Sequence, residues 1–208
     1  MRKLILAAAL ATPFFASAAT NLVTNGSFET GDLSGWTVTG TASDPGVAVQ
    51  TLNAASFYNE TVNAENLAAG TKAAYFVSDL SSQTLSQSVY LAVGTYNIGF
   101  SAYAPNNGVA NPGAATFSGS IADVSLANYS VSTGGAWHDY SGTKTITTAG
   151  NYNVAFTFNT FGGASKDIVV DSVYVVAAPV PEPETYAMLL AGLGLIGAAV
   201  KRRKAKQA

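Results

Sequence analysis

The side chains that could do catalysis are few in this sequence, and they form no familiar set. His138 is the only histidine, and it stands beside Asp139 and Tyr140. One imidazole can serve a serine triad, but no Gly-x-Ser-x-Gly turn occurs, and a catalytic zinc site would need further histidines. Two carboxylates could still act as a glycosidase pair. We expect His138 to be an ordinary strand residue and the protein not to be an enzyme.

Two carboxylates stand out by their surroundings. Glu29 and Asp171 each interrupt an expected strand of apolar or small residues, near opposite ends of the central region. A hard cation with oxygen ligands would make a buried carboxylate pair tolerable, where two bare charges would not be. The alternative is that both are strand carboxylates that face solvent.

Aromatic side chains are the other candidates, because a flat ring can lie on a sugar. Trp36 and Trp137 are expected in the core, since large aromatics in a small sandwich are usually packing residues. The loop aromatics Tyr58, Tyr103 and Phe161 are better placed for a ligand, but no feature of the sequence singles one out.

Charge and composition exclude several classes of function. The 208 residues carry a net charge of -2, but residues 20–180 hold three lysines against ten carboxylates, a net charge of -7. Such a region repels phosphate backbones, so nucleic-acid binding is excluded. The absence of cysteine excludes disulfides, thiolate zinc sites and thiol catalysis.

The elements that must position these residues are short strands. Between turn signals such as Asn111-Pro112-Gly113, apolar and polar residues alternate with a period of two. The clearest runs cover residues 73–78, 96–102, 143–147, 152–158 and 168–176. Many short strands at regular spacing predict an all-β fold, an antiparallel jelly-roll β-sandwich, over residues 20–178.

The first 19 residues have the three parts of a secretory signal peptide. Arg2 and Lys3 precede an apolar stretch at residues 4–11, and small residues follow at 16–18. Cleavage by signal peptidase is expected after Ala18 or Ala19. The mature chain is therefore predicted to be exported.

The last 30 residues, 179–208, combine three features in order. A proline-rich stretch precedes a predicted transmembrane helix at about residues 185–200, which would span roughly 24 Å, and a basic tail follows at 201–208. Basic residues stay in the cytoplasm, so residues 20–180 would lie outside. The stop-transfer cluster is Lys201, Arg202, Arg203 and Lys204.

This C-terminus resembles the PEP-CTERM sorting signal of Gram-negative bacteria. The resemblance rests on Val180-Pro181-Glu182-Pro183, the short apolar helix and the basic tail. It implies that an exosortase, a membrane cysteine protease and transpeptidase, reads Pro181-Glu182-Pro183. An ordinary C-terminal anchor with a proline linker is the alternative.

The central region resembles the galactose-binding-domain-like jelly roll of many carbohydrate-binding modules. The matching parts are NGSFETG at residues 25–31 with Trp36 behind it, and the closing segment DIVVDSV at residues 167–173. The resemblance implies the fold over residues 21–177 and a structural Ca²⁺ held by Glu29 and Asp171. It also suggests a polysaccharide ligand, although fold alone does not fix function.

Together these features predict an exported surface or extracellular-matrix protein. It would be anchored transiently in the bacterial inner membrane, processed by signal peptidase and an exosortase, and associated with exopolysaccharide in a biofilm matrix. The negative region favours a neutral glycan over an anionic one. The alternatives are a membrane-anchored enzyme that acts on polysaccharide, and an inert structural coat protein.

Overall fold

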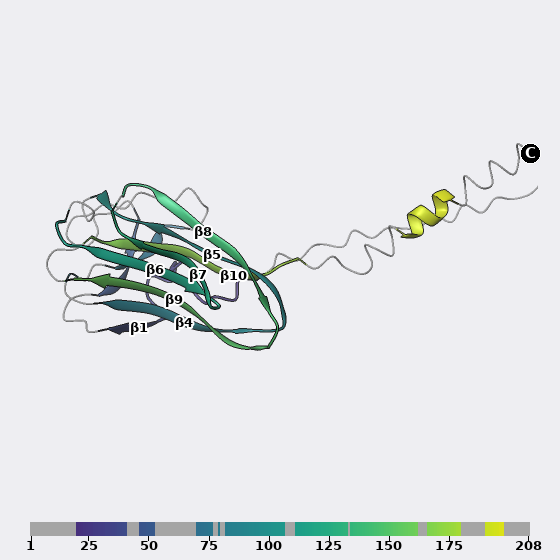
Figure 1. Cartoon of the computed structure of the whole chain (residues 1–208), viewed down its shortest axis with the longest axis horizontal. Coiled ribbons are helices and arrows are strands. Elements are labelled where there is room, and N and C mark those ends of the chain that lie inside the picture. Colours follow the sequence, from purple (N-terminus) through teal and green to yellow (C-terminus); the bar gives the residue numbers. More distant parts are fainter. Residues whose placement is uncertain are drawn as a thin grey trace, which may run out of the picture.

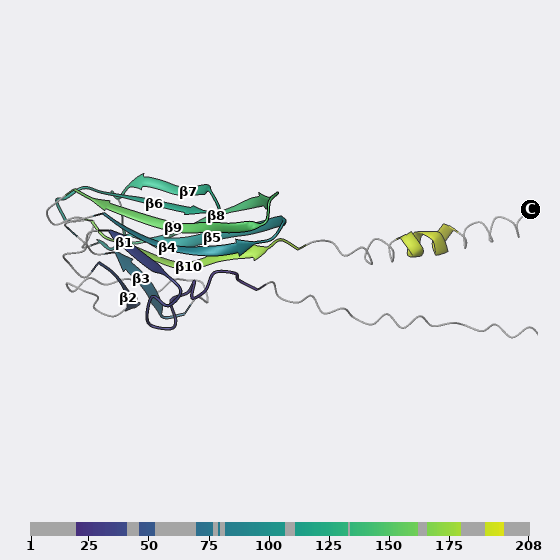
Figure 2. The same ribbon diagram turned by 90° about the horizontal axis from the view of Figure 1, so that it is seen from below.

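Two five-stranded antiparallel sheets pack face to face in the computed structural model of this chain (Figures 1 and 2). The structure describes residues 20–40, 46–52, 70–76, 79, 82–106, 111–132, 134–161, 166–179 and 190–197. One sheet has the order β1-β4-β9-β6-β7 and the other β2-β3-β10-β5-β8. The predicted all-β, jelly-roll sandwich is confirmed. The strands are β1 (Thr37–Gly40), β2 (Val47–Thr51), β3 (Lys72–Phe76), β4 (Gln83–Leu91), β5 (Gly94–Tyr103), β6 (Ala115–Ile121), β7 (Val124–Ser130), β8 (Trp137–Ile146), β9 (Gly150–Thr160) and β10 (Ile168–Ala177).

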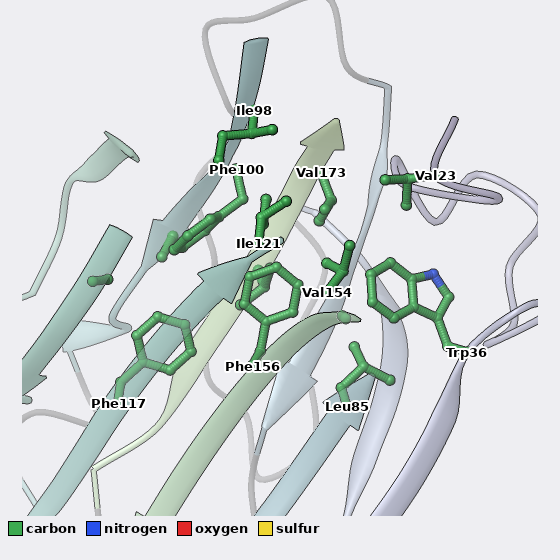
Figure 3. Packing of buried hydrophobic residues seen from close by; sticks show 14 of the residues in the cluster. Val23, Trp36, Leu85, Ile98, Phe100, Phe117, Ile121, Val154, Phe156 and Val173 are labelled. Atoms are coloured by element: carbon green, nitrogen blue, oxygen red, sulfur yellow. The ribbon is translucent and has the colours of Figure 1, made fainter. Parts of the chain in front are cut away.

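Alternating side chains fill the space between the sheets. Val154, Phe156 and Phe158 of β9 are buried, while the residues between them are partly exposed, as the period of two predicts. Phe100 of β5 meets Phe156 edge to face, with ring centroids 4.8 Å apart. Phe117 of β6 lies against both rings (Figure 3). This aromatic centre fixes the register of the central strands, because a shift by one residue would turn every ring outward.

A smaller apolar cluster lies on the outer face of sheet β2-β3-β10-β5-β8. Tyr75, Tyr103 and Val169 are its buried centre, and the indole of Trp137 packs on Tyr103 with ring centroids 5.4 Å apart. The interpretation of Tyr103 as a loop residue that contacts a ligand is wrong. It is the last residue of β5 and only 2% exposed, because this sheet is covered on both faces at that end.

The last strand contains a bulge that binds the first turn of the domain. The register of β10 against β5 shifts between Asp171 and Tyr174, and Ser172 between them has a positive φ of 53°. The amide of Val173 donates to the carbonyl of Gly26 at 2.9 Å. The carbonyl of Val173 accepts from the side-chain amide of Asn21 at 2.8 Å. The segments NGSFETG and DIVVDSV, far apart in sequence, therefore meet in space.

Gly26 is required by this contact, since a Cβ at residue 26 would fall against the carbonyl oxygen of Val173. We expect Gly26→Ala to lower the free energy of unfolding by about 1–3 kcal/mol, the usual cost of forcing extra volume into a packed site. Urea unfolding of the mature domain would measure the loss. Gly150→Ala is the matched control, because nothing lies within 4 Å of a Cβ there. Equal stabilities of the two variants would contradict the proposed role of Gly26.

Candidate functional site

The outer face of β5, β8 and β10 carries a row of polar side chains. On β5 the side chains of Ile98 and Phe100 enter the core, so Asn97 and Ser101 point outward. Cross-strand pairing then places Ser141 of β8 opposite Gly99, and Asp139 opposite Ser101. A face built from amides, hydroxyls and a carboxylate can both donate and accept hydrogen bonds.

Two adjoining depressions on this face form what we call the outer groove. The larger has a volume of about 520 Å³ and the smaller of about 340 Å³, and Tyr174 and Ser141 line both. Gly99 lies opposite both Ser141 and Tyr174, and a Cβ there would stand 2.5 Å from the hydroxyl oxygen of Tyr174. The groove's described outward-facing polar and aromatic lining residues are Asn97, Ser101, Asp139, Ser141, Thr143, Ser172 and Tyr174.

The bulge in β10 is what turns Tyr174 toward this groove. Asp171 lies opposite Ser101, and Tyr174 lies opposite Gly99. An advance of three residues along β10 therefore corresponds to only two residues along β5. The extra residue lets Val173 enter the core while Tyr174 stays outside, half-buried. In a regular strand, Tyr174 would instead lie on the face opposite to Asp171.

Three aromatic rings stack against the smaller part of the groove. Tyr140, which lines its smaller part, stacks on Phe100 at 5.0 Å and on Tyr129 at 6.2 Å between ring centroids. Burial, and then the hydrogen bond with Tyr140, raise the pKa of Tyr129. The hydroxyl therefore stays protonated at neutral pH and does not act as a base.

The described residues of the groove include one hydrogen-bonded pair of a hydroxyl and a carboxylate. The Ser101 hydroxyl donates to Asp139 Oδ1 at 2.7 Å, which could look like part of a nucleophilic site. The only histidine of the sequence is His138, an exposed residue of β8 as expected, and it lies opposite Ala102, whose side chain enters the core. Adjacent residues of a strand face opposite sides, so its imidazole points away from Ser101.

The two tryptophans are packing residues. Trp36 is 8% exposed, its ring lies between Phe28 and Phe156, and its indole N–H donates to the carbonyl of Asn25 at 3.1 Å, so the prediction for it is confirmed. Trp137 also packs, but on the outer cluster and only partly buried. Phe161 is 68% exposed, and Tyr58 lies outside the described residues.

Glu29 and Asp171 have unlike environments. Glu29 lies in an exposed turn, not in a strand as expected, and its Oε1 accepts from the backbone amides of Thr71 and Lys72 at 2.7 and 2.6 Å. Asp171 is fully buried in β10, and its Oδ1 accepts from the amide of Ser172 at 2.6 Å.

Pairing of β3 with β10 brings the two carboxylates to the same part of one sheet. Asp171 follows Val170, which lies opposite Ala74 of β3. Glu29 is bonded to the amide of Lys72, two residues before Ala74. Among the described residues, no three His, Asp or Glu side chains gather into a metal site. Ca²⁺ takes six to eight oxygens, so Glu29 and Asp171 would need backbone carbonyls to complete a site. The calcium ion stays a prediction.

Both predicted targeting signals lie largely outside the described residues. These include Ala18 and Ala19, residues 180–183 and the basic cluster at 201–204. Residues 190–197 are helical, within the expected span of 185–200, and Leu190, Leu193 and Leu195 are exposed on that helix. In the part of the chain that the structure describes, no helix has both the length and the apolar character needed to cross a membrane.

Comparison with known proteins identifies the C-terminal segment. Residues 179–204 match the PEP-CTERM protein-sorting motif. The match covers Val180, Pro181, Glu182 and Pro183 as well as the basic cluster. No curated protein sequence matches the chain significantly.

Several solved structures share the sandwich. Part of the tailspike protein 4 enzymatically active domain of bacteriophage CBA120 is 18% identical over 76% of this chain, with a TM-score of 0.50, although only 21% of that chain is covered. TmCBM61, solved in complex with beta-1,4-galactotriose, is 23% identical over 77% of this chain and 100% of its own, with a TM-score of 0.49.

The xylan-binding CBM22-1 domain of Paenibacillus barcinonensis Xyn10C is 16% identical over 80% of this chain and 100% of its own, with a TM-score of 0.45. At these identities the similarity concerns the fold alone. The sorting motif is more specific. The chain joins an antiparallel β-sandwich to a PEP-CTERM protein-sorting motif, which implies export and processing by an exosortase to a place at the cell surface.

Proposed function

We propose that this protein is an exosortase-processed component of a Gram-negative bacterial surface or matrix that binds a neutral glycan of the exopolysaccharide through its outer groove. The single observation that carries the proposal is the PEP-CTERM motif at residues 179–204, which follows the described β-sandwich. The sandwich would be the delivered cargo, and the C-terminal segment the address that is removed.

The chemistry of the outer groove supports glycan binding. Hydroxyl and amide side chains such as Asn97 and Thr143 match the hydroxyls of a sugar, and the half-buried ring of Tyr174 offers a face for a pyranose. Asp139 is the one charged residue among the described lining residues. Its negative charge disfavours an anionic polymer. The depressions are open to solvent, which suits a polymer chain better than an enclosed small molecule.

Two other functions compete with this proposal. A polysaccharide-acting enzyme would need a base or a second carboxylate open to the groove beside Ser101 and Asp139. Asp171 lies opposite Ser101 on β10, but it is fully buried and is not among the groove's described lining residues. An inert coat protein would need no ligand, and it remains the outcome if no glycan binds.

Processing is tested by deleting Pro181, Glu182 and Pro183. We expect the deletion to stop C-terminal cleavage and leave the full chain in the membrane, because the protease loses its recognition segment. Mass spectrometry of the extracellular wild-type protein should find a C-terminus near residues 180–185. An intact chain through Ala208 in the extracellular fraction would refute the processing.

Glycan binding is tested with Tyr174→Ala in affinity gels that contain galactan, xylan, mannan or β-glucan. Loss of a central aromatic contact should weaken retention about 5- to 30-fold, the range usual for an important binding residue. Tyr90→Ala is the matched control, since Tyr90 is 64% exposed and lies on the other sheet. If none of the four polysaccharides retains the wild-type domain, the glycan proposal is rejected and the protein is an inert structural coat protein.

A structural Ca²⁺ held by Glu29 and Asp171 is part of the same proposal, since a cation would compensate the charge of the buried Asp171 carboxylate. A chelator should then lower the melting temperature of the mature domain, and added Ca²⁺ should restore it. Asp171→Asn should abolish this response. Asp32→Asn should keep it, because Asp32 is exposed and bonded within its own turn to Thr30 and Ser34. A melting curve that chelator leaves unchanged would exclude the metal.

A further inference from the structure

The chain leaves the sandwich very close to the segment that the exosortase must read. The amide of Ala178 donates to the carbonyl of Thr95 at 2.8 Å and is thereby tied to the start of β5. Pro181 follows Ala178 by three residues, a length of chain that spans at most about 11 Å even when extended. The processing segment therefore begins within about 11 Å of the folded domain.

An enzyme that reads this segment works close beside the sandwich. A folded domain of about 100 residues has a radius of gyration of about 13 Å, which exceeds the length of free chain. The side of the sandwich that it meets is formed by the β4–β5 turn (residues 92–93), the β8–β9 turn (residues 147–149) and the end of β10, which we call the base. Strand pairing holds these parts together, since Gly94 lies opposite Ile146 and Leu91 opposite Gly150. Figure 1 shows the tip of β10 at this end of the domain.

The base is rigid and presents an apolar side chain. The hydroxyl of Tyr96 donates to the carbonyl of Ala92 at 3.0 Å, and that of Tyr152 to the carbonyl of Thr148 at 2.8 Å, so a tyrosine braces each turn. Val93 stands at the tip of the β4–β5 turn and is 67% exposed. An exposed valine on a preformed turn costs little entropy to bury in a partner.

We infer that the base of the sandwich is the docking surface for the exosortase, with Val93 as its apolar contact. This inference rests on the proposed processing at Pro181–Pro183 and adds a second recognition element on the folded domain. A lipid surface is the less favoured occupant. Two charged residues border the base in the described part of the chain: Lys144 lies opposite Tyr96, and Asp123 follows Ala122, whose amide donates to the carbonyl of Asn153 near the start of β9. Their charges have opposite signs and give no net attraction to anionic lipid.

The test compares how fast full-length variants are processed in cells that contain the exosortase. The rate is measured from the mass of the chain at intervals after a pulse of synthesis. Val93→Asp and Val93→Lys should each slow processing about tenfold, because either charge would be desolvated in an apolar contact. Phe161→Asp should be processed like the wild type. Phe161 is equally exposed, at 68%, but follows β9 at the opposite end and is not among the described residues of the outer groove. Unchanged melting temperatures would show that the variants fold.

Two results would overturn the inference while leaving the processing itself intact. In one, both Val93 variants are processed as fast as Phe161→Asp, although deletion of Pro181–Pro183 still blocks cleavage. In the other, only Val93→Asp is slow and Val93→Lys is normal, as expected for contact with an anionic lipid surface. Normal cleavage of the deletion variant would instead refute the proposed processing, and the docking surface with it.

Discussion

The contact between the first turn and the bulge of the last strand is the interaction on which the rest of the structure depends. Val173 uses both its amide and its carbonyl there, bonding Gly26 and Asn21, so the bulge leaves neither of these groups unsatisfied. The same contact closes the sandwich, because it joins residues about 150 positions apart. Only glycine at residue 26 permits the close approach of the two backbones. The side chain of Val173 meanwhile belongs to the same buried core cluster as Val154 and Trp36 (Figure 3).

The outer groove follows from this bulge. One extra residue in β10 reverses the alternation of side chains, so that Asp171 and Tyr174 face the same side although they are three residues apart. Tyr174 then lies over Gly99, and the missing side chain there leaves room for the ring. The feature that locks the two ends of the domain together also provides the aromatic face of the proposed binding site.

The sorting segment and the proposed binding groove are physically separable in this arrangement. β5 contacts both, since the carbonyl of Thr95 accepts from Ala178 where the chain leaves the sandwich, and Asn97, Phe100 and Ser101 line the groove. The sorting segment begins after Ala178, so its removal breaks no described hydrogen bond of the sandwich. The domain can therefore keep its fold and its groove after processing. The base, by contrast, is close enough to the processing segment to take part in its recognition.

The sequence by itself determined the all-β class, the strands with a clear period of two, the packing role of Trp36 and the sorting signal, because each depends on local pattern or on a short linear motif. It gave no indication that Tyr174 faces outward or that Tyr103 is buried. It also misplaced Glu29, which lies in a turn. Those outcomes depend on the register of strands that are distant in sequence. A bulge of one residue changes which face a side chain occupies, and the hydrophobic pattern of the sequence does not reveal it. Whether the outer face of a strand is covered is likewise decided only by the tertiary structure.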